Sequence, residues 1–286
     1  QKVVLITGAS AGLGLCLAKQ LKDQNFHLVL TARESSLLRF KKNDIIEDKN
    51  TWLRPLDVTR KDQRELLISE INNKLGGVDI LINNAGIIFR SVLEHITDED
   101  RDIQMDVNFK SVMNLIRLVL PSMRAKRDGR IINVSSVGGM MAMPTMAAYS
   151  ASKFALEGAT EALYYEVKPW NIKVSLIAPG FINSGSFENT HYTKLSQTSL
   201  DNPTDPYHQH YTNMAPFIRR NMQLSPATQK GVATKIIKTI AKANPPLRIM
   251  ATPDAVFFGF LRRIPPRWFY HWMLYRSLPG IKKWGK

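Results

Sequence analysis

The chain has 286 residues, is 44% hydrophobic and carries a formal net charge of +15, which suits one large α/β domain with a sizeable core or two small domains. Its single cysteine, Cys16, excludes an internal disulfide and fits a reducing compartment such as the cytoplasm, and the lack of any run of about 20 apolar residues argues against a membrane-spanning helix. The charge favours anionic partners, among them phosphorylated cofactors, anionic lipids, acidic proteins and nucleic acid, without choosing between them.

The ends of the chain and its histidines carry little functional signal. The first residue is Gln1 rather than Met, and no secretory signal pattern opens the chain, so a targeting segment before it would not be visible. No metal site is predicted, because there is no cysteine pair. His208 and His210 lie in a stretch rich in Pro and Asn and are expected in a solvated loop.

A strand, a glycine turn and a helix are predicted at the start of the chain. A β-branched apolar run at residues 3–7 leads into Gly8, Gly12 and Gly14, and leucines at helical spacing follow from Leu13. In this setting the glycines let the backbone approach a pyrophosphate, and the helix N-terminus offers N–H groups and the positive end of its dipole. A tight structural turn is the alternative, since the spacing differs from the commoner Gly-x-Gly-x-x-Gly.

The second predicted strand, residues 27–31, bears on the choice of cofactor. An acid near its end would bind the ribose 2′-hydroxyl of NAD, whereas an arginine accommodates the 2′-phosphate of NADP. Arg33 stands there, and a guanidinium matches phosphate geometry. Glu34 is a competing signal, so NADP is favoured over NAD without excluding it.

The third and fourth predicted strands, residues 53–56 and 78–82, also end in polar or small residues. Asp57 follows the third strand and either accepts from an adenine amino group or caps the predicted helix 62–75. Residues 83–86, Asn-Asn-Ala-Gly, follow the fourth strand and would let a cofactor lie across the strand ends. A plain turn is the alternative.

A long helix is predicted from Asp98 to Met123 on its apolar periodicity. Asn108 lies inside it between apolar neighbours. An amide in such a place is either a satisfied buried polar group or a kink that binds a water.

The stretch from Ser135 to Lys153 combines three groups suited to proton transfer. It follows a buried strand at residues 130–134 and ends in an Ala-rich helix, on which Tyr149 and Lys153 share one face. A free phenol has a pKa of about 10, and a nearby ammonium is expected to lower it. Ser136 would donate to the same substrate oxygen. An ordinary amphipathic surface is the alternative for the Tyr–Lys pair alone.

Another strand at residues 172–178 is followed by the segment from Pro179 to Ser184. Strands alternate with helices along the chain, which predicts an α/β fold with a doubly wound parallel sheet of Rossmann type, in a single domain at residues 1–254. The residues singled out above all fall at the C-terminal ends of strands or in helices that begin there, and this is the edge at which such sheets bind ligands.

Together these motifs resemble the classical short-chain dehydrogenase/reductase family over about residues 1–185. The motifs that carry the resemblance are residues 7–14, Asn83-Asn84-Ala85-Gly86, Asn108, Ser136, Tyr149-x-x-x-Lys153 and Pro179-Gly180. The resemblance implies that Tyr149 is the general acid or base, that Lys153 binds the nicotinamide ribose and lowers the Tyr149 pKa, and that Ser136, with Ser135 as the fallback, polarises the carbonyl. It also implies that Asn108 binds a water in the proton relay.

The resemblance also implies a cofactor-binding set and an oligomer. The implied set is Gly8, Ser10, Gly12, Leu13, Gly14, Arg33, Asp57, Asn84, Ala85, Gly86, Tyr149, Lys153, Pro179, Gly180, Ile182 and Ser184. Ala11 occupies a position that is often basic in NADP-preferring members, so the NADP prediction depends on Arg33. Family members are mostly dimers or tetramers that pair through the helices bearing Tyr149 and Asn108, so a homodimer or homotetramer is expected.

The chain departs from the family pattern after Ser184. Residues 185–224 are polar and are interpreted as a lid loop over the substrate, with a flexible insertion as the alternative. A helix is predicted from Ser225 to Ala243, and a last strand at residues 247–250.

Residues 255–286 form a basic, aromatic C-terminal extension. It contains seven Lys or Arg, nine aromatic residues and no acid, and Pro265-Pro266 divides it into two pieces too short to span a membrane. This composition is typical of a segment at a membrane interface. Packing on the subunit or on a second copy is an equal alternative. Nucleic-acid binding is not expected, because no reading motif accompanies the charge.

The sequence therefore predicts a cytoplasmic enzyme, with possible peripheral membrane contact, that uses NADP(H) to reduce a carbonyl or oxidise an alcohol. Four methionines between Met140 and Met146 and the C-terminal extension favour an apolar, steroid-, retinoid- or lipid-like substrate. The alternatives are a 3-oxoacyl thioester reductase, whose acidic carrier protein would suit the basic surface, and a non-catalytic nucleotide-sensing protein of the same fold.

Overall fold

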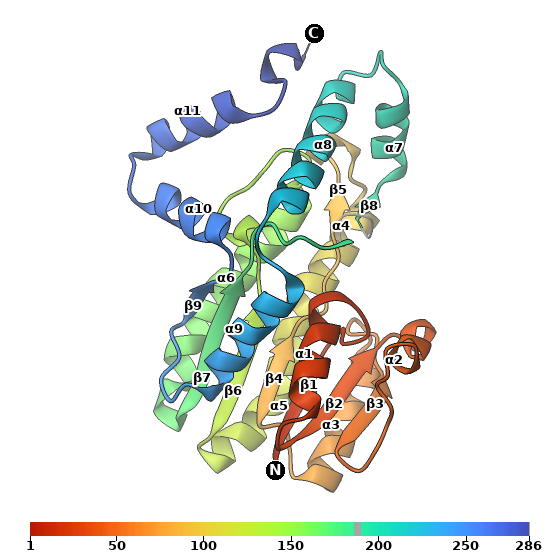
Figure 1. The fold of residues 1–286 in the computed structure, drawn as a ribbon, viewed down its shortest axis with the longest axis vertical. Coiled ribbons are helices and arrows are strands. Elements are labelled where there is room, and N and C mark those ends of the chain that lie inside the picture. The colour runs from red at the N-terminus through yellow and green to blue at the C-terminus, as the bar shows by residue number, and fades with distance from the viewer. Residues whose placement is uncertain (186–189, 286) are drawn as a thin grey trace.

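A computed structural model describes residues 1–185 and 190–285 and places a seven-stranded parallel sheet at the centre of the molecule (Figure 1). The strands are β1 (Lys2–Ile6), β2 (Phe26–Ala32), β3 (Thr51–Pro55), β4 (Ile80–Asn83), β6 (Gly129–Val134), β7 (Ile172–Ala178) and β9 (Arg248–Met250). Their order in the sheet is β3-β2-β1-β4-β6-β7-β9. The chain therefore adds strands on one side of β1 up to β3 and on the other side from β4 onward. This is the doubly wound Rossmann arrangement that the sequence predicts, and the predicted strand ends shift by no more than two residues.

Helices cover both faces of the sheet. They are α1 (Gly12–Lys22), α2 (Leu38–Lys41), α3 (Lys61–Leu75), α4 (Asp98–Met105), α5 (Ser111–Lys126), α6 (Ala147–Val167), α7 (Lys194–Asp201), α8 (His208–Leu224), α9 (Gln229–Ala241), α10 (Pro253–Arg263) and α11 (Arg267–Ser277). Short helical turns are η1 (Glu34–Ser36), η2 (Leu93–His95), η3 (Asp106–Lys110), η4 (Val137–Gly139), η5 (Lys168–Trp170) and η7 (Ile281–Lys283). A small second sheet pairs β5 (Phe89–Arg90) with β8 (His191–Tyr192).

The hydrophobic core lies in two layers, one on each face of the sheet. In β1, Val3 and Leu5 pack against α3, α5 and α6, whereas Val4 and Ile6 pack against α1 and α9. Because side chains alternate along a strand and both faces are covered, the central strands read as continuous apolar runs. Their carboxyl ends all meet at one edge, which positions the site described below.

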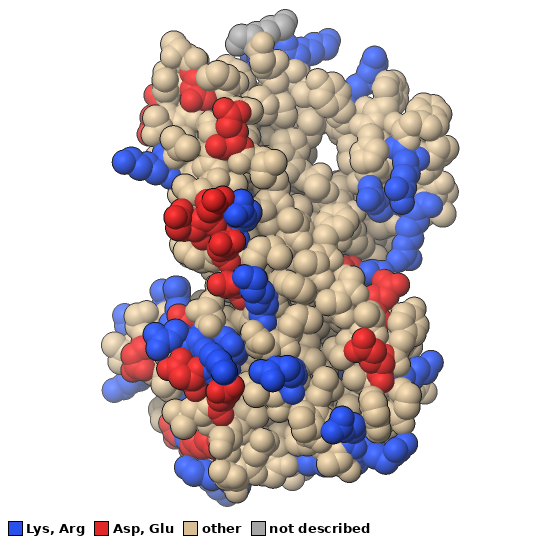
Figure 2. All heavy atoms as spheres, turned by 180° about the vertical axis from the view of Figure 1, so that it is seen from behind, with Lys and Arg blue, Asp and Glu red and all other residues tan. Residues whose placement is uncertain are grey.

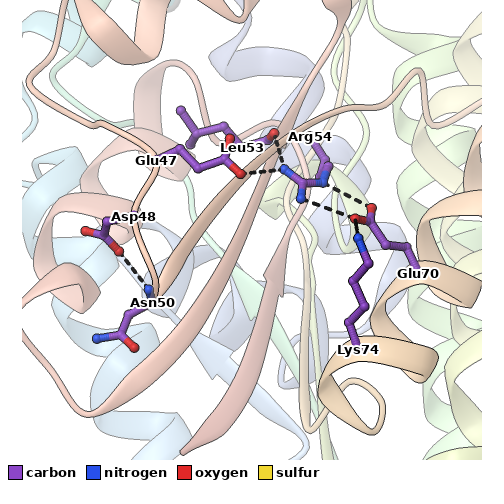
Figure 3. Close-up of polar contacts among 7 residues, drawn as sticks. All are labelled: Glu47, Asp48, Asn50, Leu53, Arg54, Glu70 and Lys74. Atoms are coloured by element: carbon purple, nitrogen blue, oxygen red, sulfur yellow. Dashed lines mark hydrogen bonds and ion pairs between the residues drawn. The ribbon is translucent and has the colours of Figure 1, made fainter.

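Strand β3 forms one edge of the sheet and is flanked by a charged network (Figure 3). The Arg54 guanidinium donates to Glu47 Oε1 at 2.8 Å and to Glu70 Oε2 at 3.0 Å, and Lys74 Nζ lies 3.0 Å from Glu70 Oε1. The Arg54 hydrogen bonds lower the pKa of Glu70. Charged side chains along an edge strand hinder its pairing with the edge of another sheet.

The predicted helix from Asp98 to Met123 is interrupted. A π turn, η3, separates α4 from α5, and Asn108 lies within that turn. Asn108 thus lies at an irregularity of the helix, in line with its interpretation as a kink. A π turn replaces the regular helical hydrogen bonds locally, and such turns often occur at functional sites.

The segment after Ser184 contains more helix than the sequence indicated. The interpretation of residues 185–224 as a loop is wrong, because α7 and α8 occupy most of it; residues 186–189 lie outside the described part. His208 and His210 accordingly lie on α8 rather than in a loop. The helix predicted from Ser225 begins at Gln229 instead, because the Thr228 side chain caps it by accepting from Gly231 N.

The C-terminal extension forms two short helices, α10 and α11, with the break near Pro265-Pro266 that the sequence predicts. Figure 1 shows α11 projecting from the body beyond α10. Over residues 1–185 and 190–285, no helix combines the length and the hydropathy needed to cross a bilayer. Lys286 lies outside the described part.

Candidate active site

Two cavities open at the carboxyl edge of the sheet. One is a cleft of about 960 Å³ over the ends of β1, β2, β3 and β4. The other is a smaller, mostly apolar pocket of about 210 Å³ between η4, the loop that follows it and α8. Ile88 and Ile182 line both, so the two cavities adjoin.

The cleft is lined by glycines and short polar residues together with apolar side chains such as Leu56, Val58 and Ile103. Its lining includes most of the predicted cofactor set, namely Gly8, Ser10, Gly12, Leu13, Arg33, Asp57, Asn84, Ala85, Gly86, Ile182 and Ser184. No side chain caps the N-terminus of α1, so its first N–H groups face this cleft without a side-chain acceptor among the described residues. A helix end of this kind binds phosphate.

The glycine turn after β1 fits tightly against the loop after β4. A Cβ on Gly14 would lie 2.3 Å from Gly8 O and 2.6 Å from Asn84 Nδ2, so only glycine fits there. Asn84 Nδ2 donates to Thr7 O at 3.0 Å, and Thr7 Oγ1 accepts from the N–H groups of Asn84 and Ala85, both at 3.0 Å. Asn84 therefore holds the glycine turn in place. Thr7 belongs to the motif at residues 7–14, but its role in binding the loop after β4 is seen only in the structure.

The far end of the cleft, beyond β2, is basic. Arg33 lines it as predicted, and Arg39 from α2 and the buried Ser36 from η1 line it as well. Arg39 was missed in the sequence because it lies six residues after Arg33, outside any motif, and only the turn of η1 into α2 brings it to the cleft. Two guanidiniums and a hydroxyl suit a phosphate group.

Asp57 lines the cleft next to β3 but does not cap α3. Its Oδ1 accepts from Thr59 N at 2.9 Å and from Thr59 Oγ1 at 2.7 Å, and α3 begins only at Lys61. Of the two interpretations that the sequence allowed, capping is wrong, and the adenine contact stays a prediction.

The smaller pocket is lined mainly by methionine and aliphatic side chains. Met141, Met143 and Met146 contribute to it as the sequence indicated, whereas Met140 packs instead against Val137 and Ala178. The remaining apolar lining is Ile88, Val137, Pro179, Phe181, Ile182, Ile218 and Met222. Among the described residues Arg90 is the one charged side chain of this lining, and burial lowers its pKa.

Tyr149 and Ser136 lie together in the wall of this pocket. Tyr149 is 8% exposed, and a hydrogen bond joins its phenol to Ser136. Ser136 Oγ also accepts from Gly138 N at 3.0 Å. Ser135 lines the same pocket, but its Oγ has no hydrogen-bond partner among the described residues. The contact with Tyr149 favours Ser136 over Ser135 for the role of carbonyl donor.

Lys153 lies behind Tyr149 and is 6% exposed. Its Nζ donates to Val134 O at 2.9 Å and lies 6.0 Å from the centroid of the Tyr149 ring. Burial lowers the Lys153 pKa from 10.5 to about 8, with Glu157 opposing this shift. The expectation of a lowered Tyr149 pKa is wrong for the protein by itself: burial raises it, and the hydrogen bond from Ser136 only partly opposes that effect.

Asn108 is buried and clamps the segment after β4. Its Oδ1 accepts from Ile87 N at 2.9 Å, while Nδ2 donates to Ile87 O at 3.0 Å and to Ser152 Oγ at 3.1 Å. Ser152 in turn donates to Tyr149 O at 2.7 Å. Asn108 thus links the wall of the cleft to the helix that carries Tyr149 and Lys153, and a water relay at this position stays a prediction.

The loop after β7 is anchored by the start of α10. Gly180 N donates to Thr252 Oγ1 and Phe181 N donates to Asp254 Oδ2, both at 2.8 Å. Pro179 and Gly180 line the apolar pocket rather than the cleft, whereas Ser184 lines the cleft. The sequence did not single out Thr252, because a threonine before a Pro-Asp pair signals only a helix cap.

No group of three His, Cys, Asp or Glu that could hold a metal ion occurs within residues 1–185 and 190–285. The cleft, in contrast, fits a dinucleotide: a backbone cradle lies at one helix N-terminus, and a basic end lies beyond β2.

Comparisons with known proteins match the family that the sequence motifs resemble. A family model described as short chain dehydrogenase matches residues 2–194. A 3-ketodihydrosphingosine reductase from Bacteroides thetaiotaomicron is 36% identical over 252 residues, which cover 88% of each chain. The 3-oxoacyl-[acyl-carrier-protein] reductase FabG of Vibrio cholerae is 37% identical over 64% of this chain and 74% of its own.

Solved structures share the fold. A short-chain dehydrogenase from Streptomyces avermitilis superposes with a TM-score of 0.80 at 27% identity, over 97% of this chain and 99% of its own. A metagenomic short-chain oxidoreductase in complex with NADP gives a TM-score of 0.59 at 30% identity, over 62% of this chain and 81% of its own.

Proposed function

The chain belongs to the short-chain dehydrogenase family, and we propose that it is an NADP(H)-dependent oxidoreductase that reduces a carbonyl, or oxidises the matching alcohol, on an apolar substrate. The observation that carries the proposal is the position of Tyr149 and Ser136. Both line the apolar pocket, which adjoins the cleft at Ile88 and Ile182, and Lys153 Nζ lies 6.0 Å from the centroid of the Tyr149 ring. A carbonyl bound there meets a proton donor on one side and the cofactor cleft on the other.

The residues divide the proton chemistry between them. Bound NADPH supplies the hydride. Tyr149 donates its proton to the carbonyl oxygen, and Ser136 donates a second hydrogen bond to that oxygen. The raised pKa of Tyr149 keeps the phenol protonated near neutral pH, as reduction requires. The ammonium of Lys153 stabilises the phenolate left behind, and Asn108 holds the helix that carries both groups.

The form of the pocket supports a long apolar substrate. Its volume of about 210 Å³ is below the range of roughly 300–1,000 Å³ usual for pockets that enclose a ligand. It holds the reacting end of a molecule, with the remainder emerging past Met222 and Phe181. The relative that reduces 3-ketodihydrosphingosine suggests a long-chain ketone, and methionine side chains adapt readily to such chains.

The cofactor preference rests on the basic end of the cleft. Arg33, Arg39 and Ser36 surround the place where a 2′-phosphate would lie, and this supports NADP over NAD. Glu34 is not among the residues that line the cleft, which supports the same preference.

The test is cofactor oxidation followed by absorbance, with NADPH and NADH in parallel. The substrates are a short aldehyde, a ketosteroid, retinal, a long-chain 3-keto amino alcohol and a 3-oxoacyl thioester. We expect turnover of an apolar ketone with NADPH, and a loss of roughly a thousandfold in Tyr149→Phe with cofactor binding intact. Equal turnover in Tyr149→Phe would refute the catalytic assignment.

The relative FabG favours one rival, a 3-oxoacyl thioester reductase. Turnover of the thioester alone in the same panel would establish it. Tight NADPH binding with no turnover of any substrate would favour a nucleotide-sensing protein instead.

We propose further that two copies pair through α5 and α6. A hollow between these helices is lined by Met113, Ile116, Arg117, Leu120, Pro121, Arg124, Ala159, Leu163 and Glu166. Its lining is mostly apolar, with Arg117 and Arg124 contributed by α5 and Glu166 by α6. Light scattering that gives the mass of a single chain at micromolar concentration would exclude this pairing.

A further inference from the structure

Residues 253–285, here called the C-terminal arch, are held to the body at both ends. At the start, Phe258 of α10 packs with Met250 against Val137 and Met140 beside η4. At the end, the Trp284 ring lies on the His210 ring of α8, with centroids 4.2 Å apart. Figure 1 shows α11 standing away from the body between these anchors, and Figure 2 shows an opening through the molecule on that side.

The two anchors flank the apolar pocket. Val137, next to the first anchor, and Ile218 and Met222, on the helix that bears the second, are all part of its lining. The C-terminal arch is therefore anchored on two elements that line the apolar pocket, η4 and α8.

The outer side of the C-terminal arch is apolar. The large apolar residues that it exposes, with the exposed fraction of each, are Val256 (56%), Phe257 (57%), Phe260 (59%), Ile264 (65%), Trp268 (72%), Phe269 (37%), Trp272 (49%) and Tyr275 (63%). They recur at helical spacing on one side of α10 and of α11, whereas Ala255, Gly259 and Tyr270 on the other side are buried. An ordered row of exposed aromatic side chains marks an interaction surface rather than scattered surface apolar residues.

Cations accompany these aromatics without any acid. The described ones are Arg262, Arg263, Arg267, Arg276, Lys282 and Lys283, and no Asp or Glu follows Asp254. Arg276 stacks on the exposed Trp272 at 4.8 Å, which places its charge beside the apolar row, whereas Arg262 stacks at 5.3 Å on the buried Tyr270. Figure 2 shows blue side chains on this lobe.

We propose that the C-terminal arch docks on an anionic lipid bilayer and sets the mouth of the apolar pocket against the membrane surface. Aromatic rings enter the interface and the flanking cations pair with anionic headgroups. A contact between the arches of two copies is disfavoured, because it would bring two sets of cations together with no acid after Asp254 in either arch. Extraction of substrate from the bilayer rests on the proposed function, whereas the docking itself does not.

The experiment is sedimentation of the full chain with vesicles, without substrate or NADPH. One set is neutral phosphatidylcholine, and the other contains about one third anionic phosphatidylglycerol. We compare the wild type with Arg263→Glu/Arg267→Glu and with Trp268→Ala/Trp272→Ala. Lys49→Glu/Lys61→Glu, which reverses two exposed charges at the far end of the molecule, is the control, and thermal melting verifies that every variant is folded.

We expect sedimentation with anionic vesicles at low salt, weakened by salt, and a partition coefficient lower by roughly tenfold or more in both arch variants. The control should stay within about twofold of the wild type, since its charges lie away from the surface. No sedimentation of the wild type, or equal loss in the control, would overturn the proposal. The proposal would also be overturned if the arch variants lowered the molecular mass of the protein in solution and left vesicle binding unchanged, because the C-terminal arch would then bind a second copy. Vesicle binding without turnover of any ketone would refute the proposed function alone.

Discussion

The cofactor cleft and the apolar pocket adjoin at Ile88 and Ile182, yet they are built by opposite means. The part of the cleft at the glycine turn is formed by glycine and short polar residues, and Thr7 and Asn84 fix this wall through three hydrogen bonds of 3.0 Å. The pocket is formed by long side chains, chiefly methionine, that have many rotamers.

The difference fits what we propose that each cavity binds. Phosphates are recognised by N–H groups and guanidiniums in fixed positions, so the chain that supplies them must not move. An apolar chain is recognised by area excluded from water, which many arrangements of side chains provide. Substitutions in the cleft should therefore cost much more than substitutions of similar size in the pocket.

The largest effect is expected from Gly14→Ala. The added Cβ would lie 2.3 Å from Gly8 O, so the glycine turn must shift, and a shift of this size lowers NADPH affinity by roughly a hundredfold and stability by about 1–3 kcal/mol. Calorimetric titration with NADPH and thermal melting measure both. The control is Gly158→Ala, on an open helix surface with no atom within 4 Å of the new Cβ. Unchanged affinity in Gly14→Ala would show that the cleft is as adaptable as the pocket.

The next effect concerns the basic end of the cleft. Arg33→Ala and Arg39→Ala should each raise the KM for NADPH about tenfold, since each removes a charge-assisted contact to a phosphate, and should leave the KM for NADH within about twofold. The two cofactors are compared in steady-state assays on one substrate. If Arg39→Ala affects neither cofactor, Arg33 alone selects NADP.

A smaller effect is expected from pH. Because the Lys153 pKa is lowered to about 8, the ammonium is lost above that pH, and kcat/KM for reduction should fall by about half at pH 8 and further above it. The pKa of Tyr149 is raised, so the phenol keeps its proton over this interval. Lys153→Arg, which cannot deprotonate here, should give a lower but flat profile. The same fall in Lys153→Arg would assign it to another group.

The linked effect on stability has the opposite sign. Between pH 8 and 10.5 the unfolded chain keeps a proton on Lys153 that the folded protein has released. The contribution of Lys153 to stability therefore rises with pH across this window. Comparison of thermal melting between wild type and Lys153→Met isolates this contribution.

The smallest effect is expected from Met143→Leu in the pocket. The volume is nearly conserved and the site adapts, so the KM for an apolar ketone should change by less than about threefold. A change of a hundredfold would mean that the pocket fits one substrate as closely as the cleft fits its cofactor. Met113→Leu, in the hollow between α5 and α6, is the matched control outside the pocket.

The comparison also explains what could be predicted from the sequence. We could predict each strand of the main sheet, the glycine turn and the set Asn108, Ser136, Tyr149 and Lys153 from the sequence. Strands and tight turns require particular backbone conformations, and these leave local patterns of β-branched residues and glycine. The fold and the family are confirmed, whereas the roles of the individual site residues stay predictions that the experiments above test.

The remainder depends on long-range packing, which leaves no local pattern. Arg39 reaches the cleft only through the turn before α2, and Thr252 reaches the loop after β7 only because β9 lies beside that strand. The raised pKa of Tyr149 follows from burial by residues far along the chain. Helices α7 and α8 were missed because polar residues and prolines hide their periodicity.

The anchoring of the loop after β7 has a consequence for the modularity of the chain. Thr252, the N-cap of α10, and Asp254, in its first turn, hold Gly180 and Phe181, so the beginning of α10 supports the wall of the apolar pocket. The arch cannot be gained, lost or exchanged as a unit at residue 253 without releasing that wall. Any shorter relative that works by the same chemistry must keep a hydroxyl and a carboxylate at these two positions or replace the anchors by other means.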